Sequence, residues 1–356
     1  MCIRDRNYIG SKLSLLNFIG DTVDDVTNGT YSSVCDLFAG TGIVGRYFKK
    51  KGKKIIANDL QYYSYVLNRH YIGNNHPLMF SSLTDLDVPG IMISDNPIIT
   101  ICDYLSGLEG EPGFIYNNYC LGGSGERLYY SDENGKLCDA IRTKIESWMK
   151  NNKITEDEYY YLLCTLLESI DKVANTASVY GAFLKNLKES ATKRMKLVPV
   201  ELLPGKASSI VFNDDANVVA ANNPVDVLYL DPPYNQRQYA TNYHLLETIA
   251  RYDTPEIHGK TGLREYSSQK SKYCARAKVK DVFDDLITHA KAKYIFLSYN
   301  NEGLLPIDEI RAIMSKRGKY GYVTKDYHRF KADGMREYSA NSTVEYLHYV
   351  ICDEQN

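Results

Sequence analysis

The sequence predicts an α/β fold in which helices cover both faces of a mostly parallel sheet and a long insertion interrupts the pattern. Three observations support this prediction. Short apolar, β-rich runs recur along the chain, helical segments fit between several of them, and one central stretch breaks the alternation. Alternating strands and helices favour a parallel sheet, because each helix returns the chain to the edge where the next strand begins.

The first element is a strand-helix-strand unit. Residues 33–37 and 55–58 are predicted as short buried strands, and residues 41–51 as the helix between them, which Gly52 closes. Later runs bounded by polar or turn residues predict four more strands, at 210–213, 225–230, 294–298 and 344–351. A helix is predicted over 307–316, with Pro306 at a favourable first helical position and Gly318 as the cap that follows.

The central stretch, residues 77–205, is predicted as an insertion of helices and loops. Residues 109–136 are dense in Gly, Asn and Tyr and are typical of loops. Thr155 and Glu158 have the spacing of a capping box, which predicts a helix running through Ile170. The predicted domains are therefore a catalytic domain in two parts, 1–76 and 206–356, and an inserted region over 77–205.

Composition limits the class of protein. The chain has 356 residues, 44% of them hydrophobic and 24% charged, with no apolar run of the roughly 18 residues that span a membrane. No secretion signal is recognised, so a cytoplasmic location is expected. The eight cysteines lie far apart and predict free thiols, and no metal is expected. A net charge of −2 argues against indiscriminate coating of nucleic acid, although a local basic surface remains possible.

A glycine-rich loop over 36–42 follows the first predicted strand and opens the first helix, where α/β sheets bind nucleotide-like ligands. Gly40, Gly42 and Gly45 also fit the dinucleotide spacing, so this segment alone admits a nicotinamide enzyme or a plain tight turn. Asp59 ends the second predicted strand, where it would accept ribose hydroxyls or cap the next helix. Asp215, after the third, is a weaker candidate acceptor for the amino group of an adenine.

The segment with the clearest chemistry is Asp231, Pro232, Pro233 and Tyr234, directly after the predicted strand 225–230. The prolines fix the backbone and leave its carbonyls as rigid acceptors. If Asp231 and the Pro232 carbonyl each accept one hydrogen of an exocyclic amine, the nitrogen lone pair is directed at a methyl donor. Tyr234 would lie against the base, which must be flipped out of the duplex to be reached.

With Tyr8, Gly10 and Lys12 preceding these motifs, the chain resembles the adenine-N6 DNA methyltransferases of the DNA adenine methylase type, including modification enzymes of restriction systems. The resemblance implies a Rossmann-like, S-adenosylmethionine-dependent methyltransferase fold with a seven-stranded sheet and an inserted target-recognition region. It implies that Tyr8 and Lys12 line the methionine end of S-adenosylmethionine and that Asp59 takes the ribose. Residues expected to wrap the cofactor are Asp36, Phe38, Ala39, Gly40, Thr41 and Gly42. The leader over 1–6 departs from the family pattern.

The chain is expected to act as a monomer whose partner is duplex DNA. A cognate restriction endonuclease that acts separately is a second candidate partner. Basic residues gather in two runs, at 185–196 and 260–280, that would track phosphates. Candidate DNA contacts are Tyr119, Arg127, Tyr180, Lys185, Lys270 and Lys272. His244 and Glu247 resemble an acid-base pair, but we interpret them as structural.

Four alternatives stay open at this point. An RNA adenine-N6 or a DNA cytosine-N4 methyltransferase would keep the fold and the cofactor. A catalytically inactive nucleic-acid-binding module would keep only the fold, and the presence of Asp231 and Tyr234 argues against it. A nicotinamide oxidoreductase would use the glycine loop alone.

Overall fold

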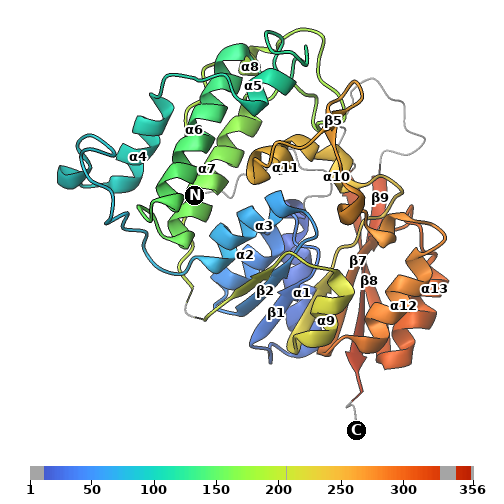
Figure 1. Cartoon of the computed structure of the whole chain (residues 1–356). Coiled ribbons are helices and arrows are strands. Elements are labelled where there is room, and N and C mark those ends of the chain that lie inside the picture. Colours follow the sequence, from blue (N-terminus) through green and yellow to red (C-terminus); the bar gives the residue numbers. More distant parts are fainter. Residues whose placement is uncertain (1–11, 206, 329–341, 354–356) are drawn as a thin grey trace. The chain divides into compact units, whose positions relative to one another are not determined.

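The computed structural model describes residues 12–205, 207–328 and 342–353. Contacts divide the chain into two compact units (Figure 1). The sheet unit comprises Met1–Asn68, Gly205–Gln238 and Ser267–Asn356, and the helical unit comprises Arg69–Pro204 and Tyr239–Tyr266. The sequence assigned residues 206–356 to one domain, whereas the contacts place Tyr239–Tyr266 with the inserted region.

The sheet unit is built on one large sheet, which has seven strands within the described residues. Their order is β3-β2-β1-β4-β7-β9-β8, in which the first five are parallel and β9 is antiparallel to both of its neighbours. This confirms the predicted mostly parallel, seven-stranded sheet. The strands are β1 (Ser33–Asp36), β2 (Lys54–Asn58), β3 (Ile210–Phe212), β4 (Val225–Leu230), β7 (Ala292–Asn300), β8 (Gly318–His328) and β9 (Ser342–Cys352).

Helices cover both faces of this sheet. Cys35 and Leu37 point into an apolar core shared with three helices, α9 (Ala216–Asn222), α12 (Val279–His289) and α13 (Ile307–Met314). Asp36 points to the opposite face, because side chains alternate along a strand. There its carboxylate accepts a hydrogen bond from the backbone of α2 (Ile43–Lys50), which packs against α1 (Leu16–Thr27). The remaining helical turns of this unit are η1 (Leu13–Leu15), α3 (Tyr62–Asn68), η4 (Ser267–Gln269), η5 (Lys272–Cys274) and η6 (Ser315–Arg317).

Strand β8 was absent from the sequence prediction. Within the part of the chain that the structure describes, it is an edge strand that pairs with β9 alone, so its residues need no continuous apolar pattern to be held in the sheet. Pro306 precedes α13 as its N-cap, one position earlier than predicted. The short η6 turn then separates the end of α13 from Gly318.

The helical unit contains two long helices that pack together, α6 (Asp132–Lys150) and α7 (Glu156–Lys172). The predicted capping box is confirmed: the Glu158 backbone N–H donates to Thr155 Oγ1 at 3.3 Å, and the Thr155 N–H donates to Glu158 Oε2 at 2.8 Å. The other elements are η2 (Arg69–Gly73), η3 (Ile91–Ile93), α4 (Pro97–Ser106), α5 (Phe114–Tyr119), α8 (Glu189–Thr192), α10 (Tyr239–Asn242), α11 (His244–Arg251) and the hairpin of β5 (Ile257–His258) with β6 (Leu263–Arg264).

Residues 109–136 are not all loop, which corrects the prediction for this segment. Helix α5 lies within it, and α6 begins before its end. The cause is tertiary: the Asp139 carboxylate on α6 accepts hydrogen bonds from the backbone N–H groups of Gly113, Ile115 and Tyr116. A distant side chain thus satisfies the backbone N–H groups in the first turn of α5, which local sequence alone does not reveal.

None of the described helices combines the length and apolar character needed to cross a lipid bilayer.

Candidate active site at the carboxyl edge of the sheet

Two predicted motifs meet because their strands are neighbours. The glycine loop follows β1 and the Asp-Pro-Pro-Tyr segment follows β4, and these parallel strands pair with Asp36 opposite Tyr229. Both motifs therefore leave the same edge of the sheet. The strand order runs outward in opposite directions from β1 and β4, and such a switch point is where open α/β sheets bind their ligands.

The glycine loop has a left-handed backbone at Gly40 (φ 52°) and Gly42 (φ 75°). The Gly40 N–H donates to Asp59 Oδ2 at 2.8 Å, and the Gly40 carbonyl accepts from Asn68 Nδ2 at 3.1 Å. A Cβ on Gly42 would lie 2.5 Å from Asn68 Oδ1. Asn68, which the sequence reasoning missed, therefore shapes the loop from the end of α3.

Of the acidic residues around this loop, Asp36 is enclosed and Asp59 is half-buried. Burial raises the pKa of Asp36 to about 7. The hydrogen bond from the Gly45 N–H, at 3.0 Å, favours the charged form of Asp36 and opposes this rise. Asp59 Oδ1 accepts the backbone N–H of Gln61 at 2.8 Å, next to the start of α3. Asp59 thus joins the glycine loop to the following helix, whereas Asp36 lies beneath the loop.

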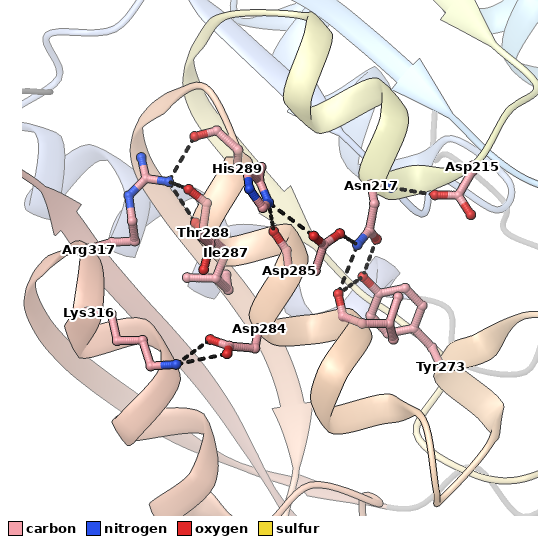
Figure 2. A network of polar contacts seen from close by, with 12 residues as sticks. Asp215, Asn217, Tyr273, Asp284, Asp285, Ile287, Thr288, His289, Lys316 and Arg317 are labelled. Carbon is pink, nitrogen blue, oxygen red and sulfur yellow. Dashed lines mark hydrogen bonds and ion pairs between the residues drawn. The ribbon is translucent and has the colours of Figure 1, made fainter.

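Asp215 serves as the N-cap of α9, where its Oδ1 accepts the Asn217 N–H at 2.9 Å (Figure 2). The Asn217 side chain donates to Asp285 Oδ2 at 2.7 Å and accepts from the Tyr273 hydroxyl at 2.8 Å. The Tyr273 ring packs edge-to-face on Phe38, with ring centroids 5.0 Å apart. This network therefore supports the aromatic side of the glycine loop from the α9–α12 layer.

A cluster of polar side chains surrounds the Asp-Pro-Pro-Tyr turn. The Tyr234 hydroxyl donates to Asp231 Oδ1 at 2.5 Å, and the Leu304 N–H anchors the Tyr234 carbonyl at 3.1 Å. Lys12 Nζ donates to the Tyr234 hydroxyl and to Glu345 Oε1, the latter at 2.7 Å, and lies 3.4 Å from Asp231 Oδ1. One ammonium thus connects a tyrosine hydroxyl with two carboxylates.

Exposure differs within this cluster. The side chains of Lys12 and Glu345 are each 5% exposed, whereas that of Asp231 is 19% exposed. Asp231 is therefore the carboxylate that a substrate can reach. Burial raises the pKa of Asp231 to about 6, and the charge of Glu345 adds to this rise while Lys12 opposes it. Burial disfavours the charged form of Lys12, but the two carboxylates outweigh it and raise its pKa.

Glu345 and its hydrogen-bond donor Ser298 were missed by the sequence reasoning. Ser298 Oγ donates to Glu345 Oε1 at 2.7 Å across the β7–β9 pair. A glutamate inside the apolar run 344–351 was the available signal, because a buried carboxylate requires partners.

Of the two predicted cofactor residues near the start of the chain, Lys12 lies at the Asp-Pro-Pro-Tyr turn and Tyr8 is outside the described residues.

Three predicted DNA contacts are engaged inside the helical unit. The rings of Tyr119 and Tyr180 are fully buried, and their hydroxyls donate to the Gly262 carbonyl at 2.9 Å and to Asp171 Oδ1 at 2.7 Å. Arg127 donates to three backbone carbonyls. The two tyrosines are core residues, which removes them as platforms for stacking on a base. The predicted lysine contacts, Lys185, Lys270 and Lys272, are exposed.

The structural interpretation of His244 and Glu247 agrees with their surroundings. His244 is buried in the helical unit, its Nε2 lies 3.0 Å from the Tyr180 carbonyl, and burial lowers its pKa to about 4. Glu247 is buried and accepts a hydrogen bond from Arg251 Nε at 2.5 Å. A neutral imidazole and a paired carboxylate hold α11 in place.

The sequence that carries both motifs matches a known family. Residues 8–313 match the family model described as D12 class N6 adenine-specific DNA methyltransferase. The chain belongs to this family. The match begins at the predicted Tyr8 segment and includes the glycine loop, the inserted region and the Asp-Pro-Pro-Tyr turn, and membership implies the use of S-adenosylmethionine.

Curated relatives support the same family. The chain is 51% identical to the Type II methyltransferase M.NlaIII of Neisseria lactamica, over 96% of this chain and 98% of that protein. It is 35% identical to the Type II methyltransferase M.CviAII of Paramecium bursaria Chlorella virus 1, with 98% of each protein covered. It is 37% identical to the Type II methyltransferase M.FokI of Planomicrobium okeanokoites over 97% of this chain, but spans only 52% of that protein.

Proposed function

We propose that this D12 class methyltransferase is a site-specific modification methylase, which places a methyl group on the exocyclic nitrogen of a flipped adenine in duplex DNA. The observation that supports this proposal is the position of Asp231 and Tyr234 at the same sheet edge as the glycine loop. No metal is assigned a role in it.

The residues around the glycine loop suit S-adenosylmethionine. Asn68 Oδ1 is buried beside Gly42 and has no hydrogen-bond partner among the described residues. Asp59 is a carboxylate fixed against the loop by the Gly40 N–H, and carboxylates at this position bind ribose hydroxyls. We assign Phe38, Ala39, Gly40, Thr41 and Gly42 to the wall of this site and Asp59 to the ribose, with Asp36 supporting the loop from below. When bound, S-adenosylmethionine supplies an electrophilic methyl carbon.

Asp231 and the Pro232 carbonyl act on the adenine amine. Asp231 Oδ1 already accepts the Tyr234 hydroxyl, whereas Oδ2 accepts no hydrogen bond from the described residues. Oδ2 can therefore take one amine hydrogen while the Pro232 carbonyl takes the other. Holding both hydrogens in place directs the nitrogen lone pair at the methyl carbon and stabilises the positive charge that develops on the nitrogen. The nitrogen–carbon bond would form as the methyl–sulfur bond breaks, and the methylated nitrogen would then lose one hydrogen to solvent as a proton. Tyr234, next to Pro233, borders the space for the base.

Lys12 and Glu345 are positioning residues in this proposal. Lys12 holds the Tyr234 hydroxyl and faces Asp231, while Glu345 balances the charge of Lys12. Without Glu345, the ammonium would bind Asp231 more strongly and compete with the amine for its oxygens. We infer that the second carboxylate keeps Asp231 available as an acceptor. The methionine end of the cofactor remains assigned to Tyr8 and Lys12 by family resemblance alone.

The substrate is tested by incubating the enzyme with tritiated S-adenosylmethionine and either unmethylated duplex DNA or RNA. The proposal expects label in DNA alone, and nucleoside analysis should find it in N6-methyladenine. Label in RNA, or in N4-methylcytosine, would support one of the alternative methyltransferases instead. Methylation-aware sequencing of DNA from cells that express the chain then gives the sequence context. Methylation scattered over unrelated sequences would contradict site specificity.

The curated relatives M.NlaIII and M.FokI carry the name Type II methyltransferase. We therefore propose that the chain protects its DNA recognition site from a separate cognate endonuclease. We also propose that it acts in the cytoplasm as a monomer. Plasmid DNA from expressing cells should resist an endonuclease that cuts at the sequenced site. Complete cleavage of that DNA would argue against a protective role.

A further inference from the structure

The turn of the β5–β6 hairpin, residues 259–262, is held by three side chains of the helical unit: two buried tyrosines and the half-buried Arg127. Arg127 donates to the Gly259 carbonyl at 2.9 Å and to the Lys260 carbonyl at 3.1 Å. The Thr261 carbonyl lies 3.0 Å from the Tyr129 hydroxyl, and the Gly262 carbonyl 2.9 Å from the Tyr119 hydroxyl. All four carbonyls of this clamped turn therefore lie within hydrogen-bond distance of a side-chain donor, and the Thr261 carbonyl shares the single Tyr129 hydroxyl hydrogen with the Tyr180 carbonyl.

The clamped turn also has a fixed backbone. Gly259 and Gly262 adopt left-handed φ angles of 67° and 72°, and the Gly262 N–H donates to the Gly259 carbonyl at 3.3 Å. A Cβ on Gly262 would lie 2.8 Å from the Tyr119 ring and 2.9 Å from Arg127 Nε. Surface turns usually leave their carbonyls to water, so such clamping orders the turn before any ligand binds.

With its carbonyls occupied, the clamped turn presents donors and positive charge. Lys260 is exposed, and the backbone N–H groups of Lys260 and Thr261 have no acceptor among the described residues. The guanidinium of Arg127 is bonded to carbonyls and forms no ion pair with a described carboxylate. The hairpin arginine is matched, since Arg264 pairs with Asp253 at 2.6 Å.

A ligand that complements such a surface is an anion with oxygen acceptors. The phosphodiester backbone of DNA fits this description, because its oxygens accept hydrogen bonds and carry negative charge. The Tyr129 hydroxyl also lies 2.7 Å from the Tyr180 carbonyl, which joins the turn to the loop carrying exposed Lys185.

We propose that the clamped turn is a DNA backbone contact, in which Lys260 binds phosphate and Tyr119, Arg127 and Tyr129 are positioning residues. This inference rests on the proposed function, because it takes duplex DNA as the substrate. It assigns the turn to affinity and orientation rather than to reading bases, since phosphate contacts carry no direct sequence information.

The test measures binding of a fluorescein-labelled duplex that contains the sequenced site, over a range of salt concentrations. Lys260→Ala is expected to weaken binding and to reduce the slope of log affinity against log salt by about 0.9, the contribution of one phosphate. Lys150→Ala, at the exposed end of α6, is the matched control and should change neither quantity. An unchanged slope and affinity for Lys260→Ala would overturn the proposal.

Tyr119→Phe and Tyr129→Phe remove one hydroxyl each and keep the rings. Both should weaken DNA binding in the wild-type background and have much smaller effects in the Lys260→Ala background, because they act through the turn. Equal effects in the two backgrounds would mean that these tyrosines merely stabilise the fold. A changed site preference in Lys260→Ala would instead identify a base contact and overturn the backbone assignment.

Methyl transfer to DNA separates this inference from the proposed function. If wild-type protein methylates adenine in DNA while Lys260→Ala binds normally, only the clamped turn is misassigned. If wild-type protein labels no DNA, the proposed function itself fails.

Discussion

Polar side chains are arranged differently in the two units. In the sheet unit, Lys12, Asp231 and Glu345 meet one another at the carboxyl edge, where charge is balanced against charge. In the helical unit, Tyr119, Tyr129 and Arg127 are bonded to backbone carbonyls, where they fix the path of a turn. In our proposals the first arrangement tunes chemistry and the second shapes a DNA-binding surface, although both consist of residue types that a sequence presents as candidate contacts.

The largest effect that tests this comparison is expected from Lys12→Met. The variant leaves Asp231 and Glu345 buried without their cation, so the free energy of unfolding should fall by about 3–5 kcal/mol. Urea unfolding measures this loss. Lys51→Met is the matched control: its partner Asp24 is also 2.7 Å away, but both side chains are at least one-third exposed, so it should lose less than about 1 kcal/mol. Equal losses would mean that the buried cluster is no more coupled than a surface pair.

A smaller effect is expected from Gly42→Ala, which tests the glycine loop. The new Cβ would meet Asn68 Oδ1 and the φ angle of 75° would be strained, so S-adenosylmethionine should bind about tenfold more weakly in calorimetry. Gly52→Ala supplies the control, because Gly52 has a φ of 76° but open space around its Cβ position. If both variants bind the cofactor equally well, the loop is not part of its site.

Glu345→Gln sharpens the account of the charge cluster through pH dependence. Asp231 must be ionised to accept an amine hydrogen, so activity should rise with pH through its pKa of about 6. The Glu345 charge raises that pKa, and its removal should move the acidic limb of kcat/KM to lower pH. Lys12, Tyr234, Tyr229 and Asp36 also face Asp231 and remain unchanged in the variant. A limb that stays in place or moves upward would contradict the assigned role.

The smallest effect on catalysis is expected from His244→Asn in the helical unit. Its imidazole is already neutral, because burial lowers its pKa to about 4. The substitution should lower the melting temperature, and the pH profile of kcat between pH 5 and 8 should keep its shape. Loss of one limb of that profile would identify His244 as an acid or base.

The sequence predicted the strands and motif positions of the sheet unit better than the contacts of the helical unit. Strand β4 was predicted at its observed bounds. An apolar run that ends shortly before two prolines predicts a buried strand that stops at the edge of a sheet. Glu345 was missed because its partner Lys12 lies at the other end of the chain. Lys260 begins a basic run that the sequence predicted to track phosphates, but the clamping of its turn was missed, because Tyr119 and Arg127 are distant in sequence and themselves resemble surface contacts. Local patterns specify strands and turns, but not which distant side chains satisfy them.

Substitution of Asp231 tests the central claim most directly. Single-turnover methyl transfer to duplex DNA should be measured for Asp231→Ala together with the affinity for S-adenosylmethionine. The account predicts a loss of about 100-fold or more in the rate, with cofactor affinity little changed, because the carboxylate acts on the amine. A variant that transfers methyl groups at the wild-type rate would contradict it.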